Sequence, residues 1–194
     1  APRGRAEPAM TEIAIAFDVP TLDEALALDA RFGTGPEYAK IGLELFTAEG
    51  PEAVRALKRR GRRVFLDLKL HDIPNTVRGA AHSAARLGAE LLTVHAPGGA
   101  AMIAAAAEGI ASGGGGTKLV AVTLLTSLDP ANLPPGFARP FDQDAVIAGL
   151  LRMSLDSGAH GIVCAAPDLE RVRAMHGAPF YAVTPGIRPA GGAT

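Results

Sequence analysis

Three charged residues, Asp67, Lys69 and Asp72, lie within six residues of one another in the stretch FLDLKLHDIPNTV at residues 65–77. The apolar residues around them predict a buried strand, in which an unpaired charge is costly. Alternate side chains of a strand share a face, so Asp67 and Lys69 are expected to point the same way. One face near the C-terminal end of this strand is therefore expected to be charged. Because the strands of a parallel barrel carry their chemistry at that end, the stretch predicts a functional site there.

A structural interpretation of the same residues stays open. Asp72 is also typical of a helix N-cap ahead of Pro74, and Asp67 and Lys69 are also compatible with a buried structural ion pair. A structural pair needs two members, whereas this set has three. The number of charges favours the functional interpretation.

Polar residues also lie at the predicted ends of other strands, and each has an ordinary explanation when taken alone. A turn, a long side chain that reaches solvent, a satisfied core histidine or a loop hydrogen bond would account for them one by one. Because the carboxyl ends of parallel strands meet at one rim, their convergence there favours a site. These residues are Asp18, Lys40, His95, Thr126 and Ser127.

The elements that would position these residues alternate between strands and helices. Strand starts at residues 13, 38, 63, 91 and 118 are spaced by 25 to 28 residues, which favours a (β/α) barrel over a doubly wound sheet. We therefore predict an α/β fold, a (β/α)8 TIM-type barrel. The apolar, β-branched runs that predict buried strands are 13–17, 38–46, 63–70, 91–96, 118–125, 161–166 and 180–187.

Helix start and stop signals fall between these runs. Thr21 and Glu24 form a capping-box pattern at the start of a helix over 21–31. Glycines are expected to end three further helices, over 51–60, 75–87 and 146–155. The segment SGGGG at 112–116 predicts a flexible connection, and the Pro-rich segment 127–140 predicts a long loop over the catalytic mouth.

Composition limits the possible partners. The formal net charge of −1 and the pI near 6.6 give no basic excess for nucleic acid or an anionic membrane, so a small-molecule partner is expected. The single cysteine, Cys164, is expected in a buried strand and fits a reducing cytoplasm. Residues 1–10 are interpreted as a leader or cloning remnant, and residues 11–194 as a single barrel domain. No run is long enough to predict a membrane-spanning helix.

Six motifs in order along the chain resemble those of the orotidine monophosphate decarboxylase family. The most specific is DLKLHDIPNT at 67–76, whereas KIG or VHA alone would be weak. The resemblance implies removal of CO2 from orotidine monophosphate to give UMP, without metal or organic cofactor, in a homodimeric barrel. The motifs are AFDVP at 16–20, KIG at 40–42, FLDLKLHDIPNT at 65–76, TVHAPGG at 93–99, VTLLTS at 122–127 and TPGIRP at 184–189.

The resemblance also implies a role for individual residues. Lys69 would be the catalytic ammonium, flanked by Asp67, while Asp72 and Thr76 would complete the site of the neighbouring subunit. The remaining implied substrate contacts are Asp18 and Lys40 at the ribose, Thr126 and Ser127 at the pyrimidine, Pro185 in the strand-seven motif and Arg188 at the phosphate. The role of His95 is left open.

The sequence departs from the full family pattern at its end. A barrel needs eight strands and seven are predicted, so the eighth strand and its phosphate loop are expected to be missing from the sequence shown. A related sugar-phosphate branch, the hexulose-phosphate synthase type, shares the Asp-x-Lys-x-x-Asp strand end but uses magnesium. LHDIPNT after the lysine argues against that branch, and the three intact charges argue against a non-catalytic nucleotide-binding barrel.

Overall fold

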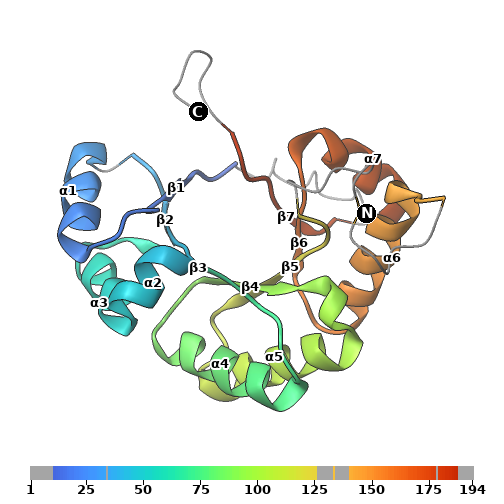
Figure 1. Cartoon of the computed structure of the whole chain (residues 1–194), viewed down its shortest axis with the longest axis horizontal. Helices are drawn as coiled ribbons and strands as arrows, with labels where there is room; N and C mark the ends of the chain where they lie inside the picture. Colours follow the sequence, from blue (N-terminus) through green and yellow to red (C-terminus); the bar gives the residue numbers. More distant parts are fainter. Residues whose placement is uncertain (1–10, 34, 126–132, 134–139, 178, 188–194) are drawn as a thin grey trace, which may run out of the picture. The chain divides into compact units, whose positions relative to one another are not determined.

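The computed structural model describes residues 11–33, 35–125, 133, 140–177 and 179–187. In this part of the chain seven strands form one sheet in the order β1-β2-β3-β4-β5-β6-β7. Strands and helices alternate along the chain, as Figure 1 shows by colour. Each strand neighbours the next one in sequence, and the pairings β1–β2, β4–β5, β5–β6 and β6–β7 are parallel. This is the topology of the first seven strands of a (β/α)8 barrel, so the predicted fold class is confirmed.

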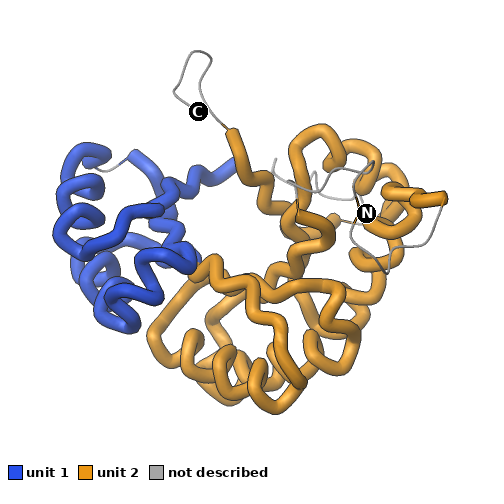
Figure 2. The backbone as a smooth tube through the Cα atoms, in the orientation of Figure 1, with its two compact units in different colours: residues 1–65 blue, residues 66–194 orange. Residues whose placement is uncertain are grey.

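The chain divides into two compact units, residues 1–65 and 66–194, and the division falls within β3 (Arg63–Leu70) (Figure 2). The prediction of a single domain over 11–194 stays a prediction, and the leader predicted at 1–10 lies outside the described residues.

The first unit holds β1 (Ala14–Ala16), α1 (Leu22–Phe32), β2 (Tyr38–Ile41), α2 (Leu43–Glu49) and α3 (Pro51–Arg59). Thr21 caps α1 as predicted, since its hydroxyl accepts a hydrogen bond from the Glu24 amide at 3.3 Å. The predicted strand over 38–46 is wrong beyond Ile41. Gly42 serves as the N-cap of α2, so the apolar residues that follow it belong to a helix.

The second unit continues from β3 into α4 (Pro74–Arg86), β4 (Leu91–His95), a short 3-10 helix (Ala96–Gly98) and α5 (Ala100–Gly113). Helices α4 and α5 lie side by side (Figure 1). A Cβ on Gly109 would come within 2.3 Å of the Arg78 carbonyl oxygen, so glycine allows this close packing. The predicted connection at 112–116 is wrong in part, because α5 includes Ser112 and Gly113.

The remaining elements are β5 (Lys118–Val122), α6 (Gln143–Asp156), β6 (Gly161–Val163), α7 (Ala166–His176) and β7 (Tyr181–Val183). Strands five to seven are therefore shorter than predicted, and Ala166 belongs to a helix. The predicted loop over 127–140 lies mostly outside the described residues.

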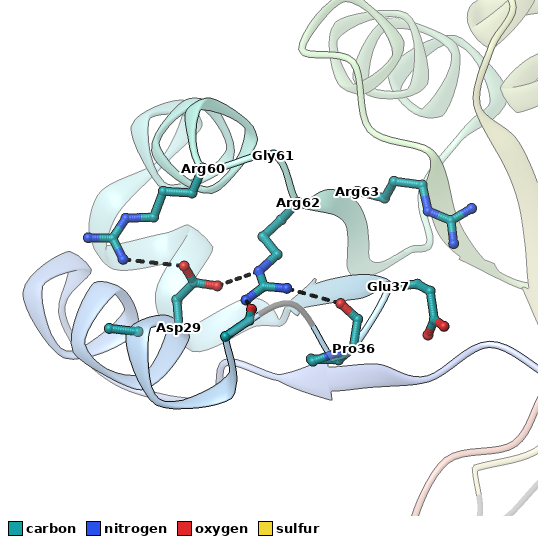
Figure 3. A pocket seen from close by; sticks show the side chains of 9 residues that line it. Asp29, Pro36, Glu37, Arg60, Gly61, Arg62 and Arg63 are labelled. Carbon is teal, nitrogen blue, oxygen red and sulfur yellow. Dashed lines mark hydrogen bonds and ion pairs between the residues drawn. The ribbon is translucent and has the colours of Figure 1, made fainter.

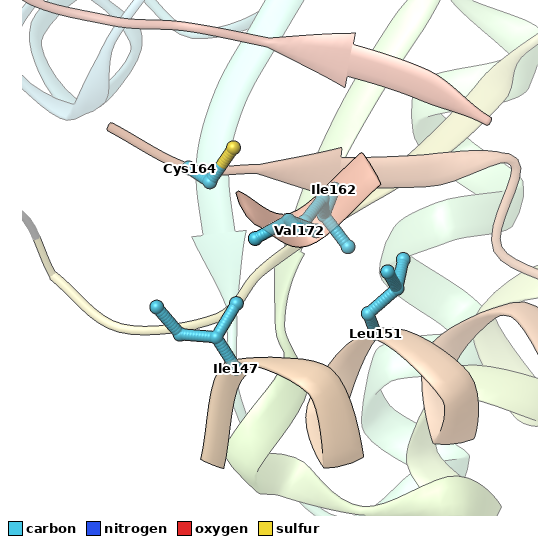
Figure 4. Close-up of a cluster of buried hydrophobic side chains, with 5 residues drawn as sticks. All are labelled: Ile147, Leu151, Ile162, Cys164 and Val172. Atoms are coloured by element: carbon cyan, nitrogen blue, oxygen red, sulfur yellow. The ribbon is translucent and has the colours of Figure 1, made fainter. Parts of the chain in front are cut away.

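A cluster of buried side chains packs α6 and α7 against β6 (Figure 4). Its members are Ile147, Leu151, Ile162, Cys164 and Val172. Cys164 follows β6 directly and is 1% exposed, which confirms that it is buried although it lies just outside the strand. Burial raises the pKa of its thiol to about 11, so the thiol is protonated at neutral pH and serves as an apolar packing group.

Gly161→Ala tests how closely β6 and β7 approach one another. A Cβ at Gly161 would come within 1.7 Å of the Tyr181 carbonyl oxygen, with which this residue is in register. Because backbone has to move, we expect the free energy of unfolding to fall by about 2 to 4 kcal/mol in denaturant titrations.

Gly149→Ala is the matched control. Gly149 lies within α6, and a Cβ there would meet no atom within 4 Å. Alanine should therefore stabilise this helix by about 0.5 to 1 kcal/mol. Equal effects of the two substitutions would contradict the close approach of β6 and β7.

Candidate active site

Asp67 and Lys69 form an ion pair near the C-terminal end of β3. The distance from Lys69 Nζ to Asp67 Oδ2 is 2.7 Å. The Asp67 side chain is 14% exposed and that of Lys69 is 31% exposed, so the pair is partly shielded yet open to a ligand. The two residues share a face of the strand, as their alternation predicted.

Thr93 of β4 connects both members of this pair and was not predicted as a site residue. Its hydroxyl donates a hydrogen bond to Asp67 Oδ1 at 3.0 Å and accepts one from the Lys69 amide at 2.9 Å. The residue is fully buried. The motif TVHA and the alternation of β4, which puts position 93 on the face of position 95, are the signals that could have found it.

The backbone of Lys69 has an unusual conformation. Its φ is 49°, in the left-handed region, and among the described residues it is the one non-glycine residue with positive φ. Such a conformation costs about 1 to 3 kcal/mol and persists where surrounding contacts hold it, often at functional sites. Strain at this residue supports a functional interpretation of the pair.

Two imidazole rings lie near the ion pair. The ring centroids of His71 and His95 are 5.4 Å apart, with the planes tilted by 46°. Burial lowers the pKa of His95 below its ordinary value, and the nearby His71 and Lys69 lower it further, whereas Asp67 opposes them. His95 is therefore a neutral ring at neutral pH, next to a cationic side chain.

Asp72 and Thr76 are exposed in the segment after β3. The alternative capping role of Asp72 is excluded, because the N-cap of α4 is Ile73 and no side chain caps it. Asp72 Oδ1 instead accepts a hydrogen bond from the adjacent Ile73 amide at 2.6 Å. Pro74 opens the helix as predicted, and Thr76 lies in its first turn.

The first unit contains a second ion pair among the predicted site residues. Lys40 Nζ, at the end of β2, lies 3.1 Å from Oδ1 of Asp18, which follows β1. A Cβ on Gly42 would come within 2.8 Å of the same Asp18 oxygen, so the glycine leaves room for the carboxylate. The structure thus brings these two strand-end residues together.

The other predicted site residues are placed separately or not at all. Pro185 is exposed, two residues after β7. Thr126, Ser127 and Arg188 lie outside the described residues. Nothing in the described part of the chain groups three or more His, Cys, Asp or Glu side chains as metal ligands.

An open hollow of about 680 Å³ lies in the first unit, and no predicted site residue lines it (Figure 3). Arg62 crosses it: Nε donates to Asp29 Oδ1 at 2.6 Å, Nη1 donates to the Pro36 carbonyl at 3.1 Å, and Nη2 donates to the Gly33 carbonyl. Arg60 also donates to Asp29, at 3.3 Å. All three nitrogen atoms of the Arg62 guanidinium thus donate to protein acceptors. This favours a structural role for the residues that line the hollow.

Charged and polar side chains at the carboxyl ends of consecutive parallel strands are typical of enzymes with the (β/α)8 barrel topology. The pairs Asp67–Lys69 and Asp18–Lys40 have this placement, so fold and site define the chain as an enzyme of this class. Residues 11–194 match the family described as orotidine 5'-phosphate decarboxylase / HUMPS, and the chain belongs to that family.

Individual relatives agree with the family assignment. The chain is 52% identical to the orotidine 5'-phosphate decarboxylase of Anaeromyxobacter sp. (strain K), over 93% of the chain and 78% of the relative. It is 43% identical to that of Cutibacterium acnes, over 95% of the chain and 78% of the relative. The solved orotidine 5'-phosphate decarboxylase from Lactobacillus acidophilus superimposes with a TM-score of 0.84 at 35% identity, covering 92% of this chain and 82% of the other.

His95→Gln should reduce the pH dependence of stability. A histidine whose pKa is lowered by folding binds fewer protons in the folded than in the unfolded state, so stability is lost as pH falls below about 6.5. We expect the free energy of unfolding to fall less between about pH 7.5 and 5.5 in the variant than in the wild type. Denaturant titrations at the two pH values measure this, and equal losses in both proteins would contradict it.

Proposed function

We propose that this chain decarboxylates orotidine 5'-monophosphate to UMP, the last step of de novo pyrimidine biosynthesis. The observation that carries the proposal is the Asp67–Lys69 ion pair at 2.7 Å, near the end of β3. It lies in the family's most specific motif, in a chain whose relatives at 42% to 52% identity are named orotidine 5'-phosphate decarboxylase. The protein would act as a carboxy-lyase.

The reaction explains why an ammonium is needed. Loss of CO2 from C6 of the pyrimidine leaves a carbanion in the plane of the ring, which no π system can delocalise. Stabilisation must therefore be electrostatic. The ammonium of Lys69 would lie beside the developing charge and then donate its proton to C6, while Asp67 holds it in an ion pair.

The attraction between the Lys69 ammonium and the charge that develops at C6 cannot supply the whole rate enhancement. Two unit charges about 4 Å apart interact by roughly 4 kcal/mol at an effective dielectric constant near 20. At about 1.4 kcal/mol per factor of ten, that is around a thousandfold. Binding energy from distant parts of the substrate has to supply more. We assign Asp18 and Lys40 to the ribose, Thr126 and Ser127 to the pyrimidine and Arg188 to the phosphate. Pro185 is assigned to the substrate site without a particular group.

We also propose a homodimer in which Asp72 and Thr76 complete the site of the neighbouring subunit. Support comes from their exposure after β3, together with the neighbouring Ile73, whose apolar side chain is 66% exposed. Exposed polar and apolar groups on one short segment fit a segment that contacts a partner. The cytoplasmic location also stays a prediction, and no helix among the described residues is long and apolar enough to cross a membrane.

A magnesium-dependent sugar-phosphate decarboxylase or synthase is the second candidate, because the matched family includes the HUMPS branch. The names of the relatives favour the first candidate. A non-catalytic nucleotide-binding barrel would not require the strained, paired Lys69.

Lys69→Ala tests the central role. We expect kcat for orotidine monophosphate, followed by the loss of its absorbance, to fall by several orders of magnitude, because the ammonium acts mainly in the transition state. UMP should still bind, as calorimetry would show. A variant that retains a tenth of the wild-type kcat would exclude this role.

Lys118→Ala is the matched control. Lys118 is an exposed lysine at the N-terminal start of strand β5, whereas the predicted site lies at the carboxyl ends of the strands. It should keep the wild-type kcat. The same assay separates the candidates: activity on orotidine monophosphate that survives EDTA supports the first, and activity that is lost in EDTA and restored by magnesium supports the second.

Mixing inactive subunits tests the shared site. In a heterodimer of Lys69→Ala and Asp72→Ala subunits, both lesions fall in one site and the other site is intact. We expect activity to return, up to about a quarter of the wild-type level for random exchange of stable subunits. Subunit exchange, followed by mass spectrometry, without any return of activity would contradict the shared site.

A further inference from the structure

Lys69 is held by two kinds of contact, one to its side chain and one to its backbone. Its ammonium meets Asp67 Oδ2 at 2.7 Å, and its amide donates to the Thr93 hydroxyl at 2.9 Å. The same hydroxyl donates to Asp67 Oδ1 at 3.0 Å. A threonine hydroxyl has one proton and two lone pairs, so its single proton is directed at Asp67. Thr93 therefore connects the backbone of Lys69 with the carboxylate that its side chain faces.

The two oxygens of Asp67 receive different donors, and this fixes the carboxylate plane. Oδ1 is bound by the Thr93 hydroxyl and Oδ2 by the Lys69 ammonium. A bond to only one oxygen would leave the group free to turn about its Cβ–Cγ bond, since that torsion has a broad energy profile. Thr93 thereby fixes the position at which Asp67 holds the ammonium.

The left-handed backbone of Lys69 also needs an explanation. A φ of 49° is unfavourable for a side chain with a Cβ, and it persists only when the surroundings determine it. The contact from the Lys69 amide to Thr93 Oγ1 is a direct restraint on that peptide unit.

Thr93 is itself rigidly placed. It is fully buried in β4, between the fully buried Leu92 and Val94, and is in register with Val120 of β5. Its branched side chain has restricted rotation about χ1, so the hydroxyl orientation follows from the strand. A buried strand is a precise support for a catalytic group.

We propose that Thr93 is a positioning residue, which holds Lys69 in its left-handed conformation and orients Asp67 so that the ammonium points into the site. The kinetic part of this inference rests on the proposed decarboxylase function. Thr93 does not touch the substrate in this account. It acts through Lys69 and Asp67.

Thr93→Val removes the hydroxyl and keeps the shape of the side chain. We expect kcat for orotidine monophosphate to fall about 10- to 100-fold, the range for losing a hydrogen bond to a charged group, while KM changes less than about threefold. Thr93→Ser keeps the hydroxyl and should retain kcat within about threefold. If the valine variant does not fold, Thr93→Cys replaces it with the same expectation, since a thiol is only a weak donor.

Thr117→Val is the control for a structural effect. Thr117 is also a buried threonine, and its hydroxyl donates to the Ala89 carbonyl at 2.6 Å, before strand β5 begins. Its replacement should cost similar stability in thermal unfolding and leave kcat unchanged. An equal fall in kcat for the Thr93→Val and Thr117→Val enzymes, a wild-type kcat for Thr93→Val, or no rescue by serine would overturn the proposal.

Crystal structures of the Thr93→Val and Thr93→Ser proteins give a readout that does not depend on activity. In the valine variant we expect Lys69 to leave the left-handed region or its ammonium to separate from Asp67, and in the serine variant we expect neither change. Lys69 and Asp67 unmoved in the valine variant would overturn the proposal. A wild-type enzyme inactive on orotidine monophosphate would instead refute the proposed function, and the crystal structures would still decide whether Thr93 positions Lys69.

Discussion

The ion pair between Asp67 and Lys69 is the interaction on which the proposed chemistry depends. A charge near a strand interior is stable only with a partner, and here the partner lies two residues away on the same strand. The local geometry of the strand alone does not fix the pair, because Lys69 has a left-handed backbone. Thr93 of the next strand restrains both residues, so the site depends on the packing of β3 and β4 as well as on the motif.

The sequence predicted the order and type of the strands because their signal is strong. Seven apolar, β-branched runs, separated by helices that end at glycines, leave few alternatives to a parallel sheet with consecutive neighbours. In the structure each of the seven runs contains one strand. Their ends were predicted less well, since KIGLELF continues as an apolar run although Gly42 begins a helix after Ile41. An apolar run alone does not distinguish the end of a strand from the start of a buried helix.

The site was predicted in part, and the missing parts share a cause. Alternation along β3 correctly placed Asp67 and Lys69 on one face. The polar strand ends were expected to meet at one rim, and Asp18 and Lys40 do form an ion pair. The positive φ of Lys69 and the two bonds of Thr93 depend on contacts between separate strands, which a pattern within one strand does not contain. The alternative of Asp72 as an N-cap was plausible for its residue type, yet Ile73 occupies that position because Pro74 already begins the helix.

The number of side-chain donors that already bind protein acceptors distinguishes the ion pair of Arg62 with Asp29 from that of Lys69 with Asp67. Asp29, 5% exposed, meets Arg62, whose side chain is 11% exposed and also donates to two backbone carbonyls. Such an arginine has its donors directed at the protein itself, and its role is to join α1, the segment before β2 and the start of β3. Lys69 differs, because an ammonium has three donors, one of which meets Asp67, and its side chain is 31% exposed. A cation that is restrained by one carboxylate and still open to solvent can direct its remaining donors at a substrate. The same kind of ion pair therefore stabilises the fold near one end of β3 and is proposed to support the chemistry near the other.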